Sequence, residues 1–346
     1  MRGMDDFRSD LMSGPPPGMA EALSAALAAA PAFGHREDVF QQRLESAVAA
    51  LMGFEDALLV PTCTIANQIA LRVWGESGHR QVLADRRSHL VSVEEKNTSA
   101  LNDVAIVEID GERGHLSPEQ VQSFVAGQAG VLIWLENTHM AHGGSVMPAG
   151  WMSRIGGIAD ASSARVHLDG SRIWNAVVKA GISPSSATSG AHSMSLSLTK
   201  GLGAPAGSML LGSRDFIARA VEVRSVFGAA WRPVGLLSAA ALHSLAGYGE
   251  RLGLDHARTA SLAKAFNEIA EAGKQGFSIN NPDTNILLLR APTPAESERL
   301  LAYLNRRDIL GLRFGKQHIR LVVHARTGDG ACQRLLNAFS DFFNKK

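Results

Sequence analysis

The sequence contains little of what marks disulfide-stabilised, nucleic-acid-binding or membrane-spanning proteins. It has only two cysteines, Cys63 and Cys332, and no CxxC spacing, which excludes a disulfide framework and favours a reducing compartment, the cytoplasm. Lysine and arginine number 34 against 33 aspartates and glutamates, so the net charge of +1 provides no general attraction for nucleic acid or an anionic membrane. No apolar run approaches the roughly 18 residues needed to span a bilayer. This balance favours a small metabolite as the partner.

The segment at residues 19–32 is rich in alanine and resembles the core of a signal peptide. Glu21 within it and the prolines at 15–17 before it argue against that interpretation. We expect instead an alanine-rich helix that follows a proline-rich turn.

What the sequence does contain is a series of short apolar runs separated by segments with helical periodicity. Such runs are typical of strands that helices cover on both faces, and they predict an α/β fold. The strands expected in the large sheet lie at residues 57–60, 81–84, 104–107, 131–135, 166–168, 194–198 and 209–211.

The last third of the chain predicts a second, smaller α/β domain. Residues 235–272 have a helical composition, with Gly247, Gly249 and Gly253 as expected interruptions. Strands are expected at 285–290 and 319–324, and helices at 296–306 and 332–343. We therefore expect an N-terminal arm at 1–13, a large domain at 14–250 and a small domain at 251–346.

Two charged residues at the ends of expected strands suggest a site for Schiff-base chemistry. Lys200 enters a glycine-rich loop, where partial burial favours a neutral amine, although alone it is better explained as a surface lysine in a turn. Asp169 would pair with the protonated pyridine nitrogen of a cofactor, or simply cap the next helix. The two are 200 − 169 = 31 residues apart, enough for a helix and a return to a neighbouring strand. The pair is therefore more specific than either residue.

Two further strand ends carry polar groups. Thr62 and Thr64 begin a helix whose N-terminus would bind a phosphate group, although simple capping by threonine is the more common arrangement. His139 lies in a polar cluster after another strand, and a lone histidine is more often a hydrogen-bonded structural residue than an acid or base.

Six segments also carry a family resemblance that covers nearly the whole chain. In the same order, they resemble the motifs of the L-threonine aldolases, which belong to the β-eliminating lyase and threonine aldolase family of pyridoxal-phosphate enzymes of fold type I. The segments are residues 7–10, 61–67, 135–139, 167–172, 197–208 and 320–324. The resemblance implies a doubly wound, mostly parallel seven-stranded sheet and a smaller C-terminal α/β domain.

The resemblance also implies how the cofactor, pyridoxal 5'-phosphate, is held. Lys200 would bind it covalently, Asp169 would pair with the ring nitrogen, and His89 would stack on the ring. The residues expected at its phosphate are Thr62, Cys63, Thr64 and, from a neighbouring subunit, Arg232.

The amino-acid substrate would be held by its carboxylate. Ser9, Arg172 and Arg320 match the residues with this role, and Arg172 would lie beside the cofactor as well. A planar guanidinium binds a carboxylate through two hydrogen bonds, which lysine does not do. A contribution of Arg232 across a subunit boundary implies a homodimer or homotetramer with shared active sites.

The implied reaction is retro-aldol cleavage of L-β-hydroxy-α-amino acids, such as L-threonine, L-allo-threonine or phenylserine, to glycine and an aldehyde. The base that accepts the β-hydroxyl proton is His89, His139 or a water molecule ordered by them. The alternatives are β-elimination or another lyase or transferase reaction on the same cofactor, and a non-catalytic cofactor-binding protein. The retention of both Arg172 and Arg320 weighs against a protein that only binds the cofactor.

Several positions depart from the family pattern. Cys63 stands where glycine is usual, His35 where tyrosine is usual, and residues 95–97 read Glu-Lys-Asn where Ala-Gly-Gly is frequent. These departures leave the substrate side chain and the aldehyde unspecified. His142 is expected to be a solvated loop residue, and no metal is expected because no His, Asp or Glu set has the spacing of a metal site.

Overall fold

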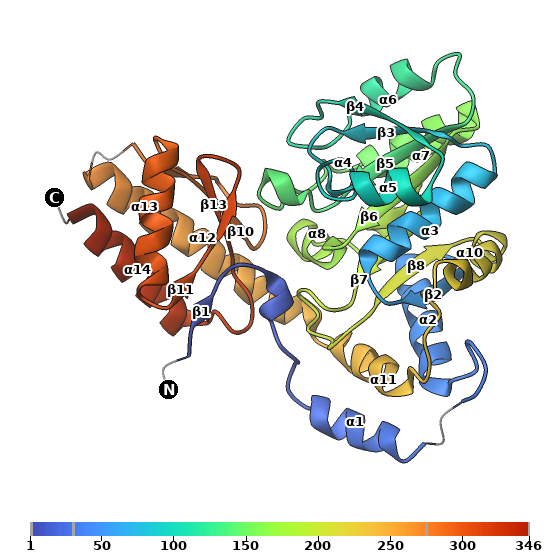
Figure 1. The fold of residues 1–346 in the computed structure, drawn as a ribbon, viewed down its shortest axis with the longest axis horizontal. Coiled ribbons are helices and arrows are strands. Elements are labelled where there is room, and N and C mark those ends of the chain that lie inside the picture. Colours follow the sequence, from blue (N-terminus) through green and yellow to red (C-terminus); the bar gives the residue numbers. More distant parts are fainter. Residues whose placement is uncertain (1–2, 30–31, 274–275, 345–346) are drawn as a thin grey trace.

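A seven-stranded sheet in the order β2-β8-β7-β6-β5-β3-β4 forms the centre of the larger part of the molecule (Figure 1). The computed structural model describes residues 3–29, 32–273 and 276–344. β8 is antiparallel to both of its neighbours, and the other pairs in the sheet are parallel. The expected α/β fold with a mostly parallel sheet is therefore confirmed. The strands are β2 (Asp56–Val60), β3 (Gln81–Asp85), β4 (Ala105–Ile109), β5 (Val131–Glu136), β6 (Arg165–Gly170), β7 (Ser193–Ser197) and β8 (Ser208–Gly212).

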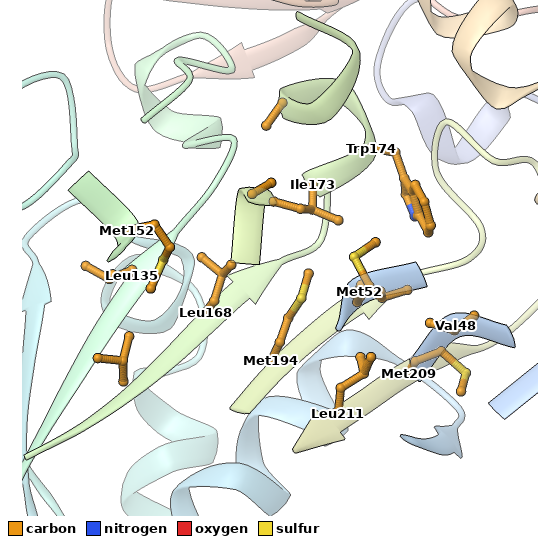
Figure 2. Packing of buried hydrophobic residues seen from close by; sticks show 14 of the residues in the cluster. Val48, Met52, Leu135, Met152, Leu168, Ile173, Trp174, Met194, Met209 and Leu211 are labelled. Carbon is orange, nitrogen blue, oxygen red and sulfur yellow. The ribbon is translucent and has the colours of Figure 1, made fainter. Parts of the chain in front are cut away.

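Helices cover both faces of this sheet, which explains why its strands read as nearly continuous apolar runs. Every residue of β5 and of β7 is buried. On one face, apolar side chains of the strands pack against α2, α7 and α8, and on the other against α3 and α10. Figure 2 shows the first of these contacts, formed by Val48, Met52, Leu135, Met152, Leu168, Ile173, Trp174, Met194, Met209 and Leu211.

The helices of this part begin where the sequence carries capping residues. Ser117 and Gln120 form the expected capping box, and the Ser213 hydroxyl accepts the backbone N–H of Phe216. The helix expected at 19–32 ends at Leu27, and residues 30 and 31 lie outside the described residues. The helices are α1 (Met19–Leu27), α2 (Val39–Met52), α3 (Cys63–Glu76), α4 (His89–Ser92), α5 (Glu95–Leu101), α6 (Pro118–Val125), α7 (Trp151–Ser162), α8 (Ile173–Ala180), α9 (Pro184–Thr188), α10 (Arg214–Val226) and α11 (Gly235–Ser244).

The C-terminal third forms an antiparallel four-stranded sheet, in the order β12-β13-β10-β9, that packs against helices (Figure 1). Its core is separate from that of the large sheet and contains Phe266, Phe339 and Phe343 in edge-to-face contact. The elements are α12 (Tyr248–Gly273), β9 (Ser278–Ile279), β10 (Ile286–Arg290), α13 (Pro294–Asn305), β12 (Leu312–Phe314), β13 (His318–Val322) and α14 (Asp329–Asn344).

The long helix α12 joins the two parts, packing first on α8 and then on α14. Gly249 and Gly253 lie inside α12, so the expected interruptions at these two positions are wrong, while Gly247 falls in the break after α11. A glycine within a helix costs only about 1 kcal/mol relative to alanine. The burial of Leu252 and Phe266 outweighs that cost. Because α12 is continuous across residue 251, the domain boundary there stays a prediction.

The N-terminal arm lies beside the C-terminal sheet, although the two are about as far apart in the sequence as the chain allows (Figure 1). β1 (Asp5–Asp6) pairs in parallel with β11 (Ile309–Leu310), and Phe7 is fully buried in the C-terminal core. After Phe7, a short 3-10 helix, η1 (Asp10–Met12), leads the chain across to the large sheet. In the part of the chain that the structure describes, every helix is too short or too polar to cross a lipid bilayer.

Candidate active site

A cavity of about 640 Å³ lies at the edge of the large sheet where β2, β6 and β7 end. This edge is where ligands bind in doubly wound sheets. The walls come from the start of α3, the loop between β7 and β8, the N-terminal arm and α1. Five residues from the sequence analysis line the cavity: Thr62, Cys63, Thr64, His89 and Lys200.

Lys200 follows β7 and is partly buried in the cavity wall. Burial lowers the pKa of its amine, and the positive charge of nearby Arg172 lowers it further. A larger fraction of this amine is therefore neutral and nucleophilic than in an exposed lysine.

Asp169 lies near the end of β6 and is only 1% exposed. Its Oδ2 accepts the side-chain N–H of Asn67 at 3.0 Å, and its Oδ1 accepts the backbone N–H of Ser171 at 3.1 Å. Burial raises the pKa of Asp169, but the positive charges of His89 and Lys200, with these hydrogen bonds, bring the pKa below its ordinary value. Among the described residues, this buried carboxylate has no ion-pair partner, although a buried charge is costly unless a cation faces it.

The first turn of α3 forms another wall. The Thr62 hydroxyl accepts the backbone N–H of Ile65 at 3.2 Å and caps the helix, as the simpler interpretation expected. The first N–H groups of a helix have no partner within it and form a binding site for an anion. Cys63 and Thr64 occupy this turn, and burial raises the pKa of the Cys63 thiol, which keeps it protonated at neutral pH.

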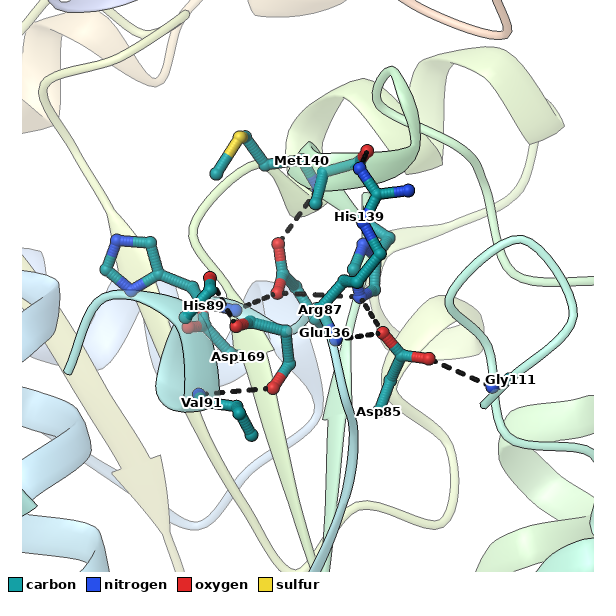
Figure 3. Close-up of polar contacts among 12 residues, drawn as sticks. Asp85, Arg87, His89, Val91, Gly111, Glu136, His139, Met140 and Asp169 are labelled. Atoms are coloured by element: carbon teal, nitrogen blue, oxygen red, sulfur yellow. Dashed lines mark hydrogen bonds and ion pairs between the residues drawn. The ribbon is translucent and has the colours of Figure 1, made fainter. Parts of the chain in front are cut away.

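His89 begins α4 and reaches the cavity. Figure 3 shows its position beside Glu136 and Asp169. Its Nδ1 lies 3.0 Å from Glu94 Oε1, and its backbone N–H donates to Glu136 Oε2 at 2.7 Å. Burial lowers the pKa of His89, but the Glu94 carboxylate and the charge of Asp169 raise it above its ordinary value overall. Glu94 is itself buried and accepts a hydrogen bond from Gln68 at 2.9 Å.

His139, the other candidate base, is completely buried and is not among the residues that line the cavity. Its Nε2 lies 3.1 Å from Asp85 Oδ1 and 3.9 Å from Glu136 Oε2. Burial lowers the pKa of His139, but these two carboxylates outweigh burial and raise it. The geometry therefore favours His89 over His139 as the group that exchanges a proton in the cavity.

The residues expected to hold a carboxylate come together around a buried aspartate that the sequence analysis did not assign. Arg172 Nε and one terminal nitrogen each donate to Asp10 at 2.8 Å, and Asp10 is fully buried. Arg320, 9% exposed, donates to the backbone carbonyl of Arg8 at 3.0 Å and has an Nε without a partner among the described residues. Ser9 caps η1 next to Asp10. Asp10 directly follows Ser9 in the motif at residues 7–10, and this position is what the sequence offers to identify it.

Arg232 lies away from the cavity in this single chain. It is exposed, donates to the backbone carbonyl of Phe33 at 2.9 Å, and stacks over the Phe33 ring. His35 is exposed in the same region, and residues 95–97 are exposed on α5. Of the departures from the family pattern named above, Cys63 lines the cavity, whereas His35 and residues 95–97 do not.

The chain belongs to the beta-eliminating lyase family, whose model matches residues 6–290. Among its relatives, the low specificity L-threonine aldolase of Escherichia coli (strain K12) is 31% identical over 327 residues, covering 93% of this chain and 94% of the relative. Low-specificity L-threonine aldolase 1 of Arabidopsis thaliana is 30% identical over 331 residues, covering 92% of this chain and 90% of the relative. The expected family is thus confirmed.

Solved structures share the fold. Leishmania major threonine aldolase superposes with a TM-score of 0.78 at 19% identity, over 98% of this chain and 99% of that chain. Sphingomonas wittichii serine palmitoyltransferase superposes with a TM-score of 0.76 at 16% identity, over 98% of this chain and 86% of that chain. The fold type expected from the resemblance is therefore confirmed.

Proposed function

We propose that the chain is a pyridoxal 5'-phosphate-dependent aldolase that cleaves threonine-type L-β-hydroxy-α-amino acids into glycine and an aldehyde. One observation carries the proposal. Lys200, whose pKa is lowered, lines the cavity and lies close enough to interact electrostatically with Asp169, a buried aspartate that has no ion-pair partner among the described residues. The low-specificity L-threonine aldolases to which the chain is similar supply the substrate class.

The residues present fit this cofactor. Lys200 provides the amine, Asp169 provides a carboxylate for a protonated ring nitrogen, and the first turn of α3 provides N–H groups for a phosphate. When bound, the cofactor supplies an electron sink for the pair released as the Cα–Cβ bond breaks.

The remaining steps belong to the side chains of the protein. Arg320, whose Nε has no partner in the described part of the chain, and the Arg172 N–H groups that do not bind Asp10 bind and orient the substrate carboxylate, and Ser9 lies beside them. His89 accepts the β-hydroxyl proton at Nε2, because its Nδ1 is held by Glu94.

Product analysis tests the reaction. We expect glycine with acetaldehyde from L-threonine or L-allo-threonine, and glycine with benzaldehyde from phenylserine. A keto acid with ammonia would instead indicate β-elimination, the activity after which the family is named. Asp169→Asn should retain the cofactor and lose most of the activity, whereas Asp160→Asn, at the exposed pair with His192, should retain both.

We further propose that Arg232 acts on the phosphate of a neighbouring subunit, which requires at least a homodimer. The distance of Arg232 from the cavity of its own chain supports this arrangement. Mixing inactive Lys200→Ala and Arg232→Ala chains should restore activity, because one site of each mixed dimer then has both residues. If Arg232 acted within its own chain, mixing would restore nothing.

A further inference from the structure

Behind the cavity, at the ends of β3 and β5, a carboxylate and two imidazoles lie together. Figure 3 shows two of these residues, Asp85 and His139. Asp85 ends β3, His139 follows β5, and His142 ends a short 3-10 helix, η2 (Met140–His142). One ligand atom from each of these three residues lies within 4.8 Å of the others. The expectation of no metal was based on spacing along the chain, but the fold joins positions 139 − 85 = 54 residues apart. A search for a metal-binding motif along the sequence therefore does not find this cluster.

Several buried nitrogens around this cluster lack hydrogen-bond partners in the part of the chain that the structure describes. They are His139 Nδ1 and both ring nitrogens of His115, whose ring lies edge-on to that of His139 at 6.0 Å. A buried polar atom without a partner costs about 1–3 kcal/mol. A ligand bound by the His139 ring would offset this cost at His139, whereas His115 lies outside the three-residue cluster.

The cluster is compact and its carboxylate is already oriented. Asp85 accepts the backbone N–H groups of Arg87 at 2.8 Å and Gly111 at 2.9 Å, an outer shell of the kind that fixes metal-binding carboxylates. Gly114 has a φ of +88°, and a Cβ there would lie 2.5 Å from the His139 ring and 2.7 Å from the His142 ring. The backbone therefore closes one side of the cluster.

The charges around the cluster allow a cation. Asp85 and Glu136 face His139 with two carboxylates, at 3.1 and 3.9 Å from its Nε2. On the other side, Arg87 donates to the carbonyl of Ala141, and Arg113 is neutralised by Asp283 at 2.6 Å. Among the described residues, Asp85 and Glu136 thus face one guanidinium without an ion-pair partner, that of Arg87.

We propose that Asp85, His139 and His142 bind one divalent transition-metal ion of the zinc class, with a fourth position open to water. Two imidazoles and one carboxylate suit Zn²⁺, Co²⁺ or Ni²⁺, whereas Mg²⁺ and Ca²⁺ prefer oxygen ligands. With bonds of about 2.0–2.1 Å, tetrahedral ligand atoms lie roughly 3.4 Å apart. The three ligand atoms lie within 4.8 Å of one another, and rotation of the half-buried His142 would bring them to bonding distance from one ion.

The position of the ion gives it a structural role. Thr284, from the C-terminal third, donates to the carbonyl of Gly144 at 2.8 Å, two residues after His142. The loop that contains His142 and Gly144 contacts the C-terminal third through this hydrogen bond. The ion would therefore hold this loop against the end of β3 in the large sheet. Binding of the ion to the native state alone stabilises that state by RT ln(1 + [L]/Kd), so the melting temperature should rise with the concentration of free Zn²⁺.

Calorimetric titration of metal-depleted holoenzyme with Zn²⁺ tests the proposal. We expect one ion per chain and at least tenfold weaker binding in His142→Asn. The matched control is His79→Asn, a half-buried histidine outside the cluster, which should bind as the wild type does. No stoichiometric binding by the wild type, or equal binding by His142→Asn, would overturn the site and leave a proton-sharing pair of Asp85 and His139.

X-ray absorption of the zinc-loaded wild type provides a second measurement that does not depend on the folding of a variant. We expect only nitrogen and oxygen neighbours, at about 2.0–2.1 Å. A sulfur neighbour at about 2.3 Å would place the ion at Cys63 or Cys332 and refute the proposal. Neither result depends on aldolase activity.

Discussion

The two halves of the proposed site are built in different ways. The cofactor half consists of Thr62, Cys63, Thr64, Asp169 and Lys200, which all lie at strand ends of the large sheet. The carboxylate half consists of Ser9, Asp10, Arg172 and Arg320, which come from the N-terminal arm, the large sheet and the C-terminal sheet.

The difference shows which half depends on packing between distant segments. In the cofactor half, hydrogen bonds such as Asn67 to Asp169 at 3.0 Å join the large sheet to α3, a helix that packs directly on it. The carboxylate half instead relies on a buried ion pair between residues 162 positions apart, Asp10 and Arg172. Substitutions in the N-terminal arm should therefore weaken substrate binding more than they weaken cofactor binding.

Loss of the cofactor half should have the largest effect on catalysis. In Lys200→Ala, we expect the visible absorption of the bound cofactor to change and kcat to fall by at least about 10³-fold, because no other amine lines the cavity among the described residues. Lys179→Ala, at the exposed end of α8, is the control and should behave as the wild type. Retention of spectrum and activity in Lys200→Ala would refute the assignment of the cofactor half.

Loss of the ion pair should affect the carboxylate half selectively. Asp10→Ala leaves a buried guanidinium without its partner, which costs about 3–5 kcal/mol of stability. We expect KM for the amino acid to rise more than tenfold while cofactor absorption persists. Asp103→Ala, at the exposed pair with Arg80, should change KM little. Loss of cofactor in Asp10→Ala at a temperature where the chain is folded would contradict the separation of the halves.

Protonation of Asp10 should break its ion pair with Arg172 only at low pH. Burial raises the pKa of Asp10, but Arg172 outweighs burial and holds it well below the ordinary value of 3.8. A lowered native pKa means that the contribution to stability is complete above the unfolded pKa and is lost as pH falls through the native one. The difference in unfolding free energy between wild type and Asp10→Asn, measured with urea, should therefore be constant from pH 5 to pH 7 and shrink below about pH 4.

A smaller effect should identify the residue that accepts the β-hydroxyl proton. Glu94 raises the pKa of His89, so Glu94→Gln should lower that pKa and move the acid limb of the kcat/KM profile down by about 0.5–1 pH unit. The exposed neighbour Glu95 provides the control variant, Glu95→Gln. An unmoved acid limb in Glu94→Gln would exclude His89 as the titrating base.

The smallest effect is expected at Cys63. Its thiol has a raised pKa and occupies a helix position where serine also fits, so Cys63→Ser should change kcat/KM by less than about threefold. A loss of more than tenfold would show that the thiol itself takes part in the chemistry.

The strands of the large sheet and the cofactor half could be predicted because their signals are local. An apolar run identifies a buried strand, and the polar residue that follows it, such as Asp169 or Lys200, lies at a sheet edge by topology alone. The pairing of β1 with β11 could not be predicted, because two-residue strands carry no periodicity. The helix interruptions expected at Gly249 and Gly253 are wrong because burial of the surrounding helix outweighs the low helix propensity of glycine.

The sequence by itself determined the α/β class, the strand ends and the family, because short-range patterns and motifs encode them. Tertiary structure alone decided that Asp10 neutralises Arg172, that His139 is buried, and that Asp85 meets His139 and His142. These contacts join segments separated by more than fifty residues. Their formation depends on the packing of whole layers, which no local pattern records.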